Sequence, residues 1–320
     1  MSTLIDHDPA DTWADILDGK NPIIEATDCG DGVSYEIYSK QPSGVYRGHP
    51  DYILSGSDLA DFDRCPSKWI GGYRDEETKS TAWGQLVDCL LMEPDGLAKR
   101  FIVIPDTYTN EKGEEKPWNF NAKVCDQWRE ANRGRIELKK ATLERGWVAA
   151  TILCTDDEIA HVVNTSRKQV MLTGIYLDEE TGLAIPLRAL IDLAPPSKFL
   201  ADLKTTNSAH PKDWQRHVYN FGYHMQAARH LDLWNAAHND NRRDFRHYVQ
   251  ENTEPFEVAK RILSSEFIAL GRQQYARALK RYARCLKTGN FPGYDDSTNP
   301  ADIVIDGHLV TSPEAWMVGV

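Results

Sequence analysis

The strictest alternation of apolar and polar residues lies at positions 185–206. Every second residue from Ile185 to Leu193 is apolar, which predicts a strand with one face in the core. Two prolines at positions 195 and 196 predict a turn, and the alternation resumes from Phe199 to Leu203. The pattern therefore predicts two strands joined by a short connection.

The polar sides of these two strands carry two acids and a lysine. Asp192 is the acid of the first strand, and Asp202 and Lys204 share one side of the second. If the strands are antiparallel neighbours, the two carboxylates lie close enough to share a divalent cation. Phosphodiester cleavage needs such a cation on carboxylate oxygens, with an ammonium nearby to orient water or neutralise charge. The same residues would also suit the wet face of an ordinary strand pair, so alternation alone leaves both interpretations open.

Apolar periodicity predicts helices and further strands around this pair. Ser55 and Asp58 have the spacing of a capping box at the start of the first helix. Residues 106–117 are predicted to form a polar loop, and residues 178–182 a hairpin turn. The predicted helices are 59–64, 81–92, 120–132, 142–153, 156–163, 210–237 and 264–287, and the other predicted strands are 101–105, 169–177, 245–250 and 256–260.

One carboxylate lies inside a predicted helix that is apolar almost all round. Asp88 is the single acid among residues 81–92. An ionised carboxylate in such surroundings is costly unless it is paired or binds a metal ion. Asp88 is therefore either a metal ligand or an internal helix partner, for instance of Arg188. Gly84, one turn earlier, would let a backbone or a phosphate approach closely, or would serve helix packing alone.

Several motifs together resemble one nuclease family. Asp192, followed about ten residues later by Asp202-Leu203-Lys204, is similar to the PD-(D/E)xK nuclease signature. The run at 202–206 resembles the DxKTT variant of exonuclease VIII, the RecE-type phage recombination nucleases. Residues 222–228 resemble that family's Tyr-x-x-Gln helix motif, and residues 84–88 and 91–94 resemble its Gly-x-x-x-His and Leu-Glu-Pro segments. One departure is plain, because Asp88 occupies the position of the family's histidine.

This resemblance implies a restriction-endonuclease-like α/β core, with a central mixed sheet flanked by helices. It implies a Mg²⁺-dependent deoxyribonuclease in which Mn²⁺ substitutes, acting from the 5′ end of linear double-stranded DNA. It also implies a role in phage-type recombination beside a single-strand annealing protein, and a homo-oligomeric ring around DNA.

The resemblance assigns roles to particular side chains. Two carboxylates and the carbonyl of Leu203 would ligate the cation, and the lysine would position or deprotonate the attacking water. Tyr223 and Gln226, three residues apart, share a helix face and can hydrogen-bond to phosphate or to metal-bound water, although a core tyrosine and a surface glutamine fit the same pattern. The expected catalytic residues are Asp192, Asp202, Lys204, Tyr223 and Gln226, and the expected metal ligands are Asp88, Asp192, Asp202 and Leu203.

Basic residues interleaved with tyrosines make the predicted helix at 264–287 a candidate DNA-contacting surface. Phosphate contacts come mostly from arginine and lysine side chains. A solvated helix face or a subunit contact would have the same composition. The expected DNA-contacting residues are Arg188, Thr205, Thr206, Arg277, Lys280, Arg281 and Arg284.

Length and composition narrow these interpretations. The 320 residues carry a net charge of -11, which excludes a generally basic surface but leaves room for a local basic groove. We expect an acidic extension at 1–43 with a short helix at 11–17, a nuclease domain at 44–292, and an irregular tail at 293–320. Six scattered cysteines, without a CxxC pair or a secretory signal, indicate core thiols in the cytoplasm of a bacterial or phage-infected cell, and no iron-sulfur cluster. No apolar run approaches the length of a membrane span.

Three functions remain open from the residues. The first is an exonuclease of the exonuclease VIII type. The second is a PD-(D/E)xK endonuclease with the same site and no need for a DNA end. The third is a non-catalytic DNA-binding or assembly protein with a degenerate nuclease fold. The intact acids and lysine oppose the third, and the motifs beyond the site favour the first.

Overall fold

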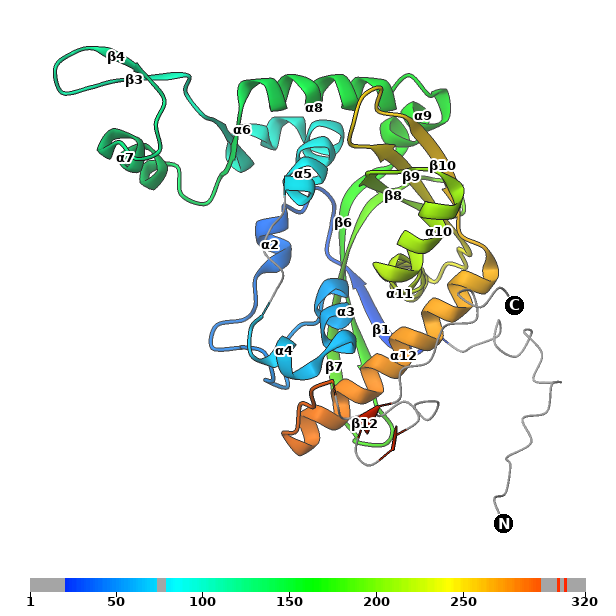
Figure 1. Ribbon diagram of the computed structural model, residues 1–320. Helices are drawn as coiled ribbons and strands as arrows, with labels where there is room; N and C mark the ends of the chain where they lie inside the picture. The colour runs from blue at the N-terminus through cyan, green and yellow to red at the C-terminus, as the bar shows by residue number, and fades with distance from the viewer. Residues whose placement is uncertain (1–20, 74–78, 295–303, 306–307, 310–320) are drawn as a thin grey trace.

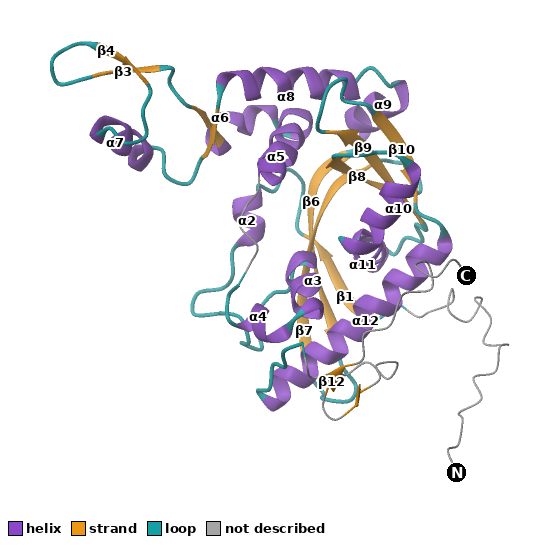
Figure 2. Ribbon diagram, viewed as in Figure 1, coloured by secondary structure: helices purple, strands orange, loops and turns teal. Residues whose placement is uncertain are grey.

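A six-stranded mixed sheet forms the centre of the molecule in the computed structural model, which describes residues 21–73, 79–294, 304–305 and 308–309. The strand order is β1-β6-β7-β8-β9-β10. Neighbours are antiparallel except β8 and β9, which are parallel. Helices flank the sheet, so the predicted fold class is confirmed (Figures 1 and 2). The strands are β1 (Ile23–Asp28), β6 (Arg167–Leu177), β7 (Ala184–Ala194), β8 (Phe199–Thr206), β9 (Asp244–Glu251) and β10 (Val258–Ile262).

Two apolar clusters cover the two faces of β8 and β9. Leu200 and Val249 belong to the cluster formed with α11 (Tyr223–His238) and α12 (Ser265–Thr288). Leu203 and Tyr248 belong to the cluster formed with α5 (Lys79–Met92), α8 (Lys140–Leu153) and α9 (Asp157–Thr165). Since successive side chains point to opposite faces of a strand, β8 is buried on both sides. Its polar residues therefore lie inside the protein rather than on a wet face.

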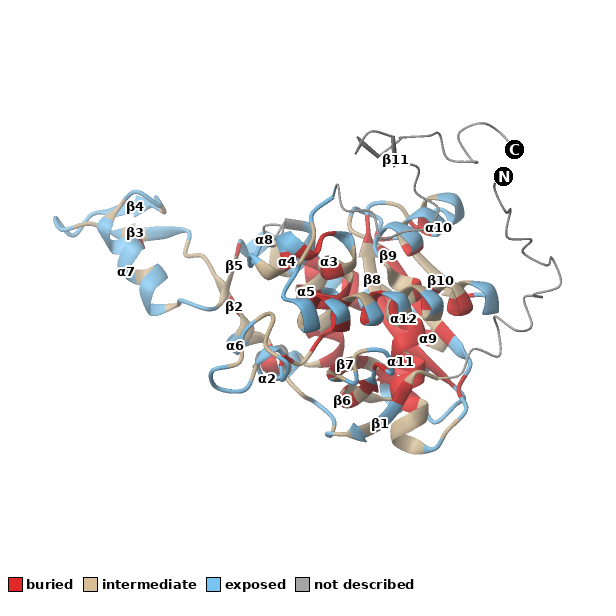
Figure 3. Cartoon of the chain, turned by 90° about the horizontal axis from the view of Figure 1, so that it is seen from below, coloured by how far each residue is buried: buried red, intermediate tan, exposed pale blue. Residues whose placement is uncertain are grey.

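The remaining elements pack at the margins. The predicted capping box is present at α3 (Gly56–Arg64), where Ser55 and Asp58 bond each other's backbone N–H groups. The segment carrying β3 (Thr107–Thr109), β4 (Glu115–Pro117) and α7 (Lys123–Ala131) projects away from the sheet and is largely exposed (Figures 1 and 3). The other short elements are α2 (Tyr35–Ser39), α4 (Pro66–Ile70), η1 (Pro94–Gly96), α6 (Leu97–Arg100), β2 (Phe101–Val103), β5 (Ile136–Leu138), α10 (Pro211–Asn220), β11 (Val304–Ile305) and β12 (His308–Leu309).

Several expected elements differ from those observed. The single helix expected at 210–237 is two helices, α10 and α11, because Gly222 adopts a left-handed conformation (φ 67°) between them. The loop expected at 106–117 contains the β3–β4 hairpin. Strand β1 lies within the expected acidic extension and forms an edge of the central sheet. The helix expected at 11–17 and most of the expected tail lie outside the described residues.

The fold contains no disulfide bond among the described residues. All six cysteines are free; four are buried, whereas Cys29 and Cys154 are exposed, so the expectation of core thiols is wrong for these two. None of the described helices combines the length and the apolar character needed to cross a membrane.

A glycine sets the distance between α11 and α12. A methyl group on Gly271 would overlap the carbonyl oxygen of His224, which belongs to the backbone of α11 and has no freedom to rotate away. We therefore expect Gly271→Ala to lower the free energy of unfolding by about 3 kcal/mol, at the upper end of overpacking costs. Urea unfolding followed by circular dichroism measures this change. Gly293→Ala is the matched control, because the one neighbour of its methyl group among the described residues would be Ser67 Oγ, at 3.7 Å. Equal losses in both variants would contradict the account.

Candidate active site

Strands β7 and β8 bring the two acids of the central pair together. Their pairing is antiparallel and includes Leu193 opposite Ala201. That register places Asp192 opposite Asp202. Asp202 is 1 % exposed, so it is an internal carboxylate and not a surface charge.

Each oxygen of the Asp202 carboxylate has a protein partner. Gln226 Nε2 donates to Oδ1 at 3.0 Å, and Lys204 Nζ lies 2.5 Å from Oδ2. Burial is the largest single effect and raises the pKa of Asp202, but the charge and hydrogen bond of Lys204, together with smaller contributions from neighbouring histidines, outweigh it and the pKa is lowered. Burial alone would lower the pKa of Lys204, and the neighbouring Asp202 raises it instead. The two side chains therefore form an ion pair at neutral pH.

Asp192 is in the opposite electrostatic situation. Its Oδ2 accepts a hydrogen bond from the backbone N–H of Leu203 at 3.3 Å. Burial, and then the negative charges of Asp202 and Asp88, raise the pKa of Asp192 well above its usual value. Without a cation, this carboxyl group is held close to other acids with too little positive charge to balance it.

Asp88 reaches the site from α5. Gly84 allows this helix to lie close to β8, because a methyl group on Gly84 would be 3.0 Å from Thr205 Oγ1. Burial is the main cause that raises the pKa of Asp88, to about 7, and the charges that act on it are Lys204, Asp202 and Arg100. Arg188 was considered from the sequence as an ion-pair partner of Asp88. Its guanidinium instead donates to the carbonyl groups of Ser39 and Lys40.

Aromatic side chains enclose the lysine. Lys204 Nζ lies 4.9 Å from the centre of the Tyr223 ring, which stacks on Trp214. His247 is fully buried beside these rings and is the β9 residue paired with Asp202. Burial lowers the pKa of His247 to about 4, so its ring is neutral at pH 7. His247 is not among the residues expected from the sequence, because only the parallel register of β8 and β9 places it beside Asp202.

The donor set suits a hard divalent cation. Carboxylate and carbonyl oxygens are the ligands that Mg²⁺ and Mn²⁺ prefer. The charges of Asp88, Asp192 and Asp202 act on one another, and a cation between them would relieve this repulsion. Within the described part of the chain, no three His, Cys, Asp or Glu side chains already surround one point as metal ligands. The residues therefore fit a metal ion in chemistry, with the carboxylates close to one another but not closed around a shared centre.

The expected DNA-contacting residues lie in several places and mostly have protein partners. Thr205 lies against α5, and Thr206 Oγ1 shares a hydrogen bond with His217 Nδ1. Arg284 forms an ion pair with Glu180, and Arg281 donates to the carbonyl oxygen of Asp63. The bonds of Arg281 and Arg284 hold the C-terminal half of α12 to its neighbours.

Arg277, also expected to contact DNA, and Glu93, in the segment 91–94, each lie near a residue of opposite charge. Arg277 Nη2 lies 3.9 Å from the Asp63 carboxylate. Glu93 precedes the η1 turn, with its carboxylate 3.8 Å from Arg100, so its observed role is at the turn.

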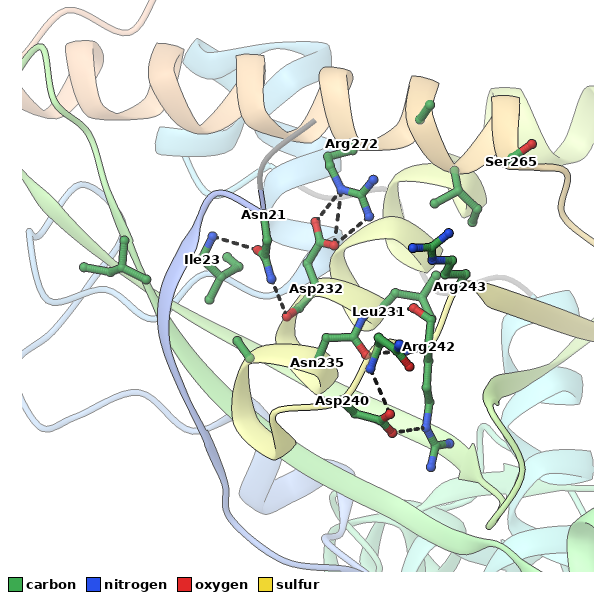
Figure 4. A pocket seen from close by; sticks show the side chains of 15 residues that line it. Asn21, Ile23, Leu231, Asp232, Asn235, Asp240, Arg242, Arg243, Ser265 and Arg272 are labelled. Atoms are coloured by element: carbon green, nitrogen blue, oxygen red, sulfur yellow. Dashed lines mark hydrogen bonds and ion pairs between the residues drawn. The ribbon is translucent and has the colours of Figure 1, made fainter. Parts of the chain in front are cut away.

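Two cavities flank α11. One, of about 340 Å³, is lined by Gln226 and Tyr223 of the candidate site together with Phe221 and Leu190. The other, of about 670 Å³, lies farther along the helix and is lined by Asp232, which pairs with Arg272, and by Arg242, which pairs with Asp240 (Figure 4). None of the candidate catalytic side chains lines the larger cavity. The smaller one is therefore the cavity that opens beside the candidate site.

Comparisons with known proteins agree with this fold. A family model described as a PDDEXK-like domain of unknown function (DUF3799) matches residues 55–300. No curated protein matches the sequence.

Solved structures add one informative match. The crystal structure of a protein from Eubacterium rectale, provisionally named an exonuclease, is similar with a TM-score of 0.54 and 15 % identity, covering 90 % of this chain and 98 % of that one. At this identity the likeness shows the fold alone. The Rai1 structure from Scheffersomyces stipitis has 11 % identity and a TM-score of 0.27, covering 65 % of this chain and 59 % of that one, and carries no argument.

The two central acids should respond differently to loss of charge. In metal-free protein at pH 7, we expect Asp202→Asn to lower the free energy of unfolding by about 3 kcal/mol, because the buried Lys204 ammonium loses its partner. Asp192→Asn should leave stability unchanged or raise it, because it removes a repelled carboxylate. Urea unfolding in EDTA measures both variants, and similar losses in the two would contradict this charge assignment.

Proposed function

This chain belongs to the family of PDDEXK-like domains, and from that premise we propose that it is a divalent-metal-dependent deoxyribonuclease that hydrolyses linear double-stranded DNA from its ends. The observation that carries the proposal is the convergence of Asp192, Asp202 and Lys204, with Gln226 bonded to Asp202. A purely structural ion pair would explain why Lys204 and Asp202 are buried together. It would not explain why the Asp192 carboxylate lies beside them.

In this proposal, Asp192, Asp202 and Asp88 hold the cation, with the Leu203 carbonyl as a further ligand and Mg²⁺ or Mn²⁺ as the metal. When bound, such a cation polarises the phosphoryl oxygen and lowers the pKa of an attacking water. The third carboxylate replaces the histidine of the family that the chain resembles. An aspartate at this position adds negative charge, which favours hard cations.

Lys204 acts as a charged group at the reacting phosphate. Its ammonium lies 2.5 Å from Asp202, so it orients the attacking water or balances charge on the phosphate more readily than it removes a proton. Gln226 fixes the Asp202 carboxylate through Oδ1. Tyr223 covers the lysine and keeps bulk water away from it.

Digestion from DNA ends rests on the order of motifs in the sequence, which resembles exonuclease VIII, and is supported by the provisional name of the structural neighbour. By the same resemblance we propose 5′ to 3′ polarity, a place in phage-type recombination beside an annealing protein, and a homo-oligomeric ring. An endonuclease would use the same carboxylates and lysine, so the choice between the two depends on the substrate.

Substrate topology tests the proposal directly. We expect the protein with Mg²⁺ or Mn²⁺ to degrade linear duplex DNA and to leave closed circles intact, because the reaction starts at an end. Gel analysis of linear, nicked circular and closed circular DNA measures this. Lys204→Ala, purified in parallel, controls for contaminating nucleases. Equal cleavage of closed circles would favour the endonuclease, and no cleavage with several metals and pH values would favour a non-catalytic protein.

Asp88 should contribute to metal affinity. We expect Asp88→Asn to weaken the apparent affinity for Mg²⁺ roughly tenfold, within the range of losses at metal sites, with activity partly restored at high Mg²⁺. A Mg²⁺ titration of initial rates, beside the parent protein, measures this shift. If Asp88 only packs inside the protein, the variant will have a lower melting temperature and the same half-saturating Mg²⁺ concentration as the parent.

A further inference from the structure

An exposed aromatic ring stands at the corner between α10 and α11. Phe221 is 58 % exposed, although it is one of the large apolar residues that normally contribute to a core. The left-handed Gly222 turns the chain directly after it, so the ring is presented outward just before the catalytic helix begins. A single exposed phenylalanine needs no explanation by itself. The residues around Phe221 suggest a reason for its exposure.

The Phe221 ring is connected to the catalytic lysine through a short series of contacts. Its centre lies 5.7 Å from the centre of the Tyr223 ring. Tyr223 in turn lies 4.9 Å from Lys204 Nζ. Only the Tyr223 ring therefore lies between Phe221 and Lys204 in this series. A ligand group stacked on Phe221 would lie close to a second ligand group that contacts Lys204.

Phe221 also lines the cavity of about 340 Å³ beside the active site. Its other apolar walls come from Leu59, Leu190 and Met225, and Gln226 of the catalytic cluster opens into the same space. The volume is at the lower end of ordinary ligand pockets. It is therefore suited to a flat apolar group of modest size with polar edges.

We propose that this cavity receives a nucleobase of the DNA strand being cleaved, stacked on Phe221, next to the nucleotide whose phosphate faces Lys204. This inference rests on the proposed nuclease function and adds a subsite to it. A phosphate alone would gain nothing from the phenylalanine and leucine walls, whereas every base has a face that stacks on an aromatic ring. The stacking gives sequence-tolerant affinity, and it holds a base that has left its pair at the DNA end.

Variants of Phe221 separate aromatic stacking from general apolar contact. For linear duplex DNA, we expect Phe221→Ala to raise KM roughly tenfold, from the usual strength of base stacking, with a smaller change in kcat. Phe221→Tyr should keep KM close to that of the parent, and Phe221→Leu should not. Tyr46→Ala is the matched control, because Tyr46 is 70 % exposed and the ring contact described for it is with His49.

Abasic substrates identify the stacked group. Short fluorescent duplexes with one abasic site, moved stepwise from the end, are measured by anisotropy in Ca²⁺ with the parent and with Phe221→Ala. At one position, the missing base should weaken binding to the parent roughly tenfold and leave binding to Phe221→Ala unchanged.

The two measurements distinguish the possible failures. If duplex DNA is bound and digested but no abasic position depends on Phe221, the stacking subsite is wrong and the nuclease stands. If the losses from the missing base and from Phe221→Ala add at every position, Phe221 contacts something other than that base and the subsite is again wrong. If no DNA is bound or cleaved, the nuclease function and the subsite fall together.

Discussion

The ion pair between Lys204 and Asp202 lies inside the sheet, where either charge alone would be costly to bury. The pair is acceptable because the Asp202 carboxylate also accepts a hydrogen bond from Gln226 of α11. This bond fixes the start of α11 against β8. The parallel pairing of β8 with β9 places His247 beside the same aspartate, on the neighbouring strand. The geometry of the candidate site thus depends on this one pair of opposite charges.

The same cluster contains an unbalanced charge. Lys204 balances the charge of Asp202. Asp192 is repelled by the charges of Asp202 and Asp88, Asp88 is repelled by that of Asp202, and burial is the main cause that raises the pKa of both Asp192 and Asp88. A protein selected for stability alone would replace at least one of these acids, because buried like charges oppose folding. This clustering of buried acids is what a cation-binding site requires, and it supports the metal-dependent function proposed above.

The strands that carry the site could be predicted from the sequence, because the alternation at 185–206 is strong and local. The burial of Asp202 could not, since α11 and the strand β9 that cover it come from later in the chain. The break at Gly222 was also missed, because an isolated glycine within a helical pattern is a weak signal until its φ is known. His247 was missed for a different reason: its position beside Asp202 depends on the register of a parallel pair whose strands are about 40 residues apart.

The distribution of charge limits how such a protein can hold DNA. A net charge of -11 opposes a general attraction between the whole surface and a phosphate backbone. The guanidinium groups of Arg188, Arg281 and Arg284 already have protein partners, so they have less to offer a phosphate. These three arginines would therefore add little to electrostatic affinity or to its dependence on salt. For the proposed nuclease, uncharged contacts beside the carboxylates would add affinity that these arginines do not supply, and the exposed Phe221 ring next to Tyr223 is placed to make one such contact.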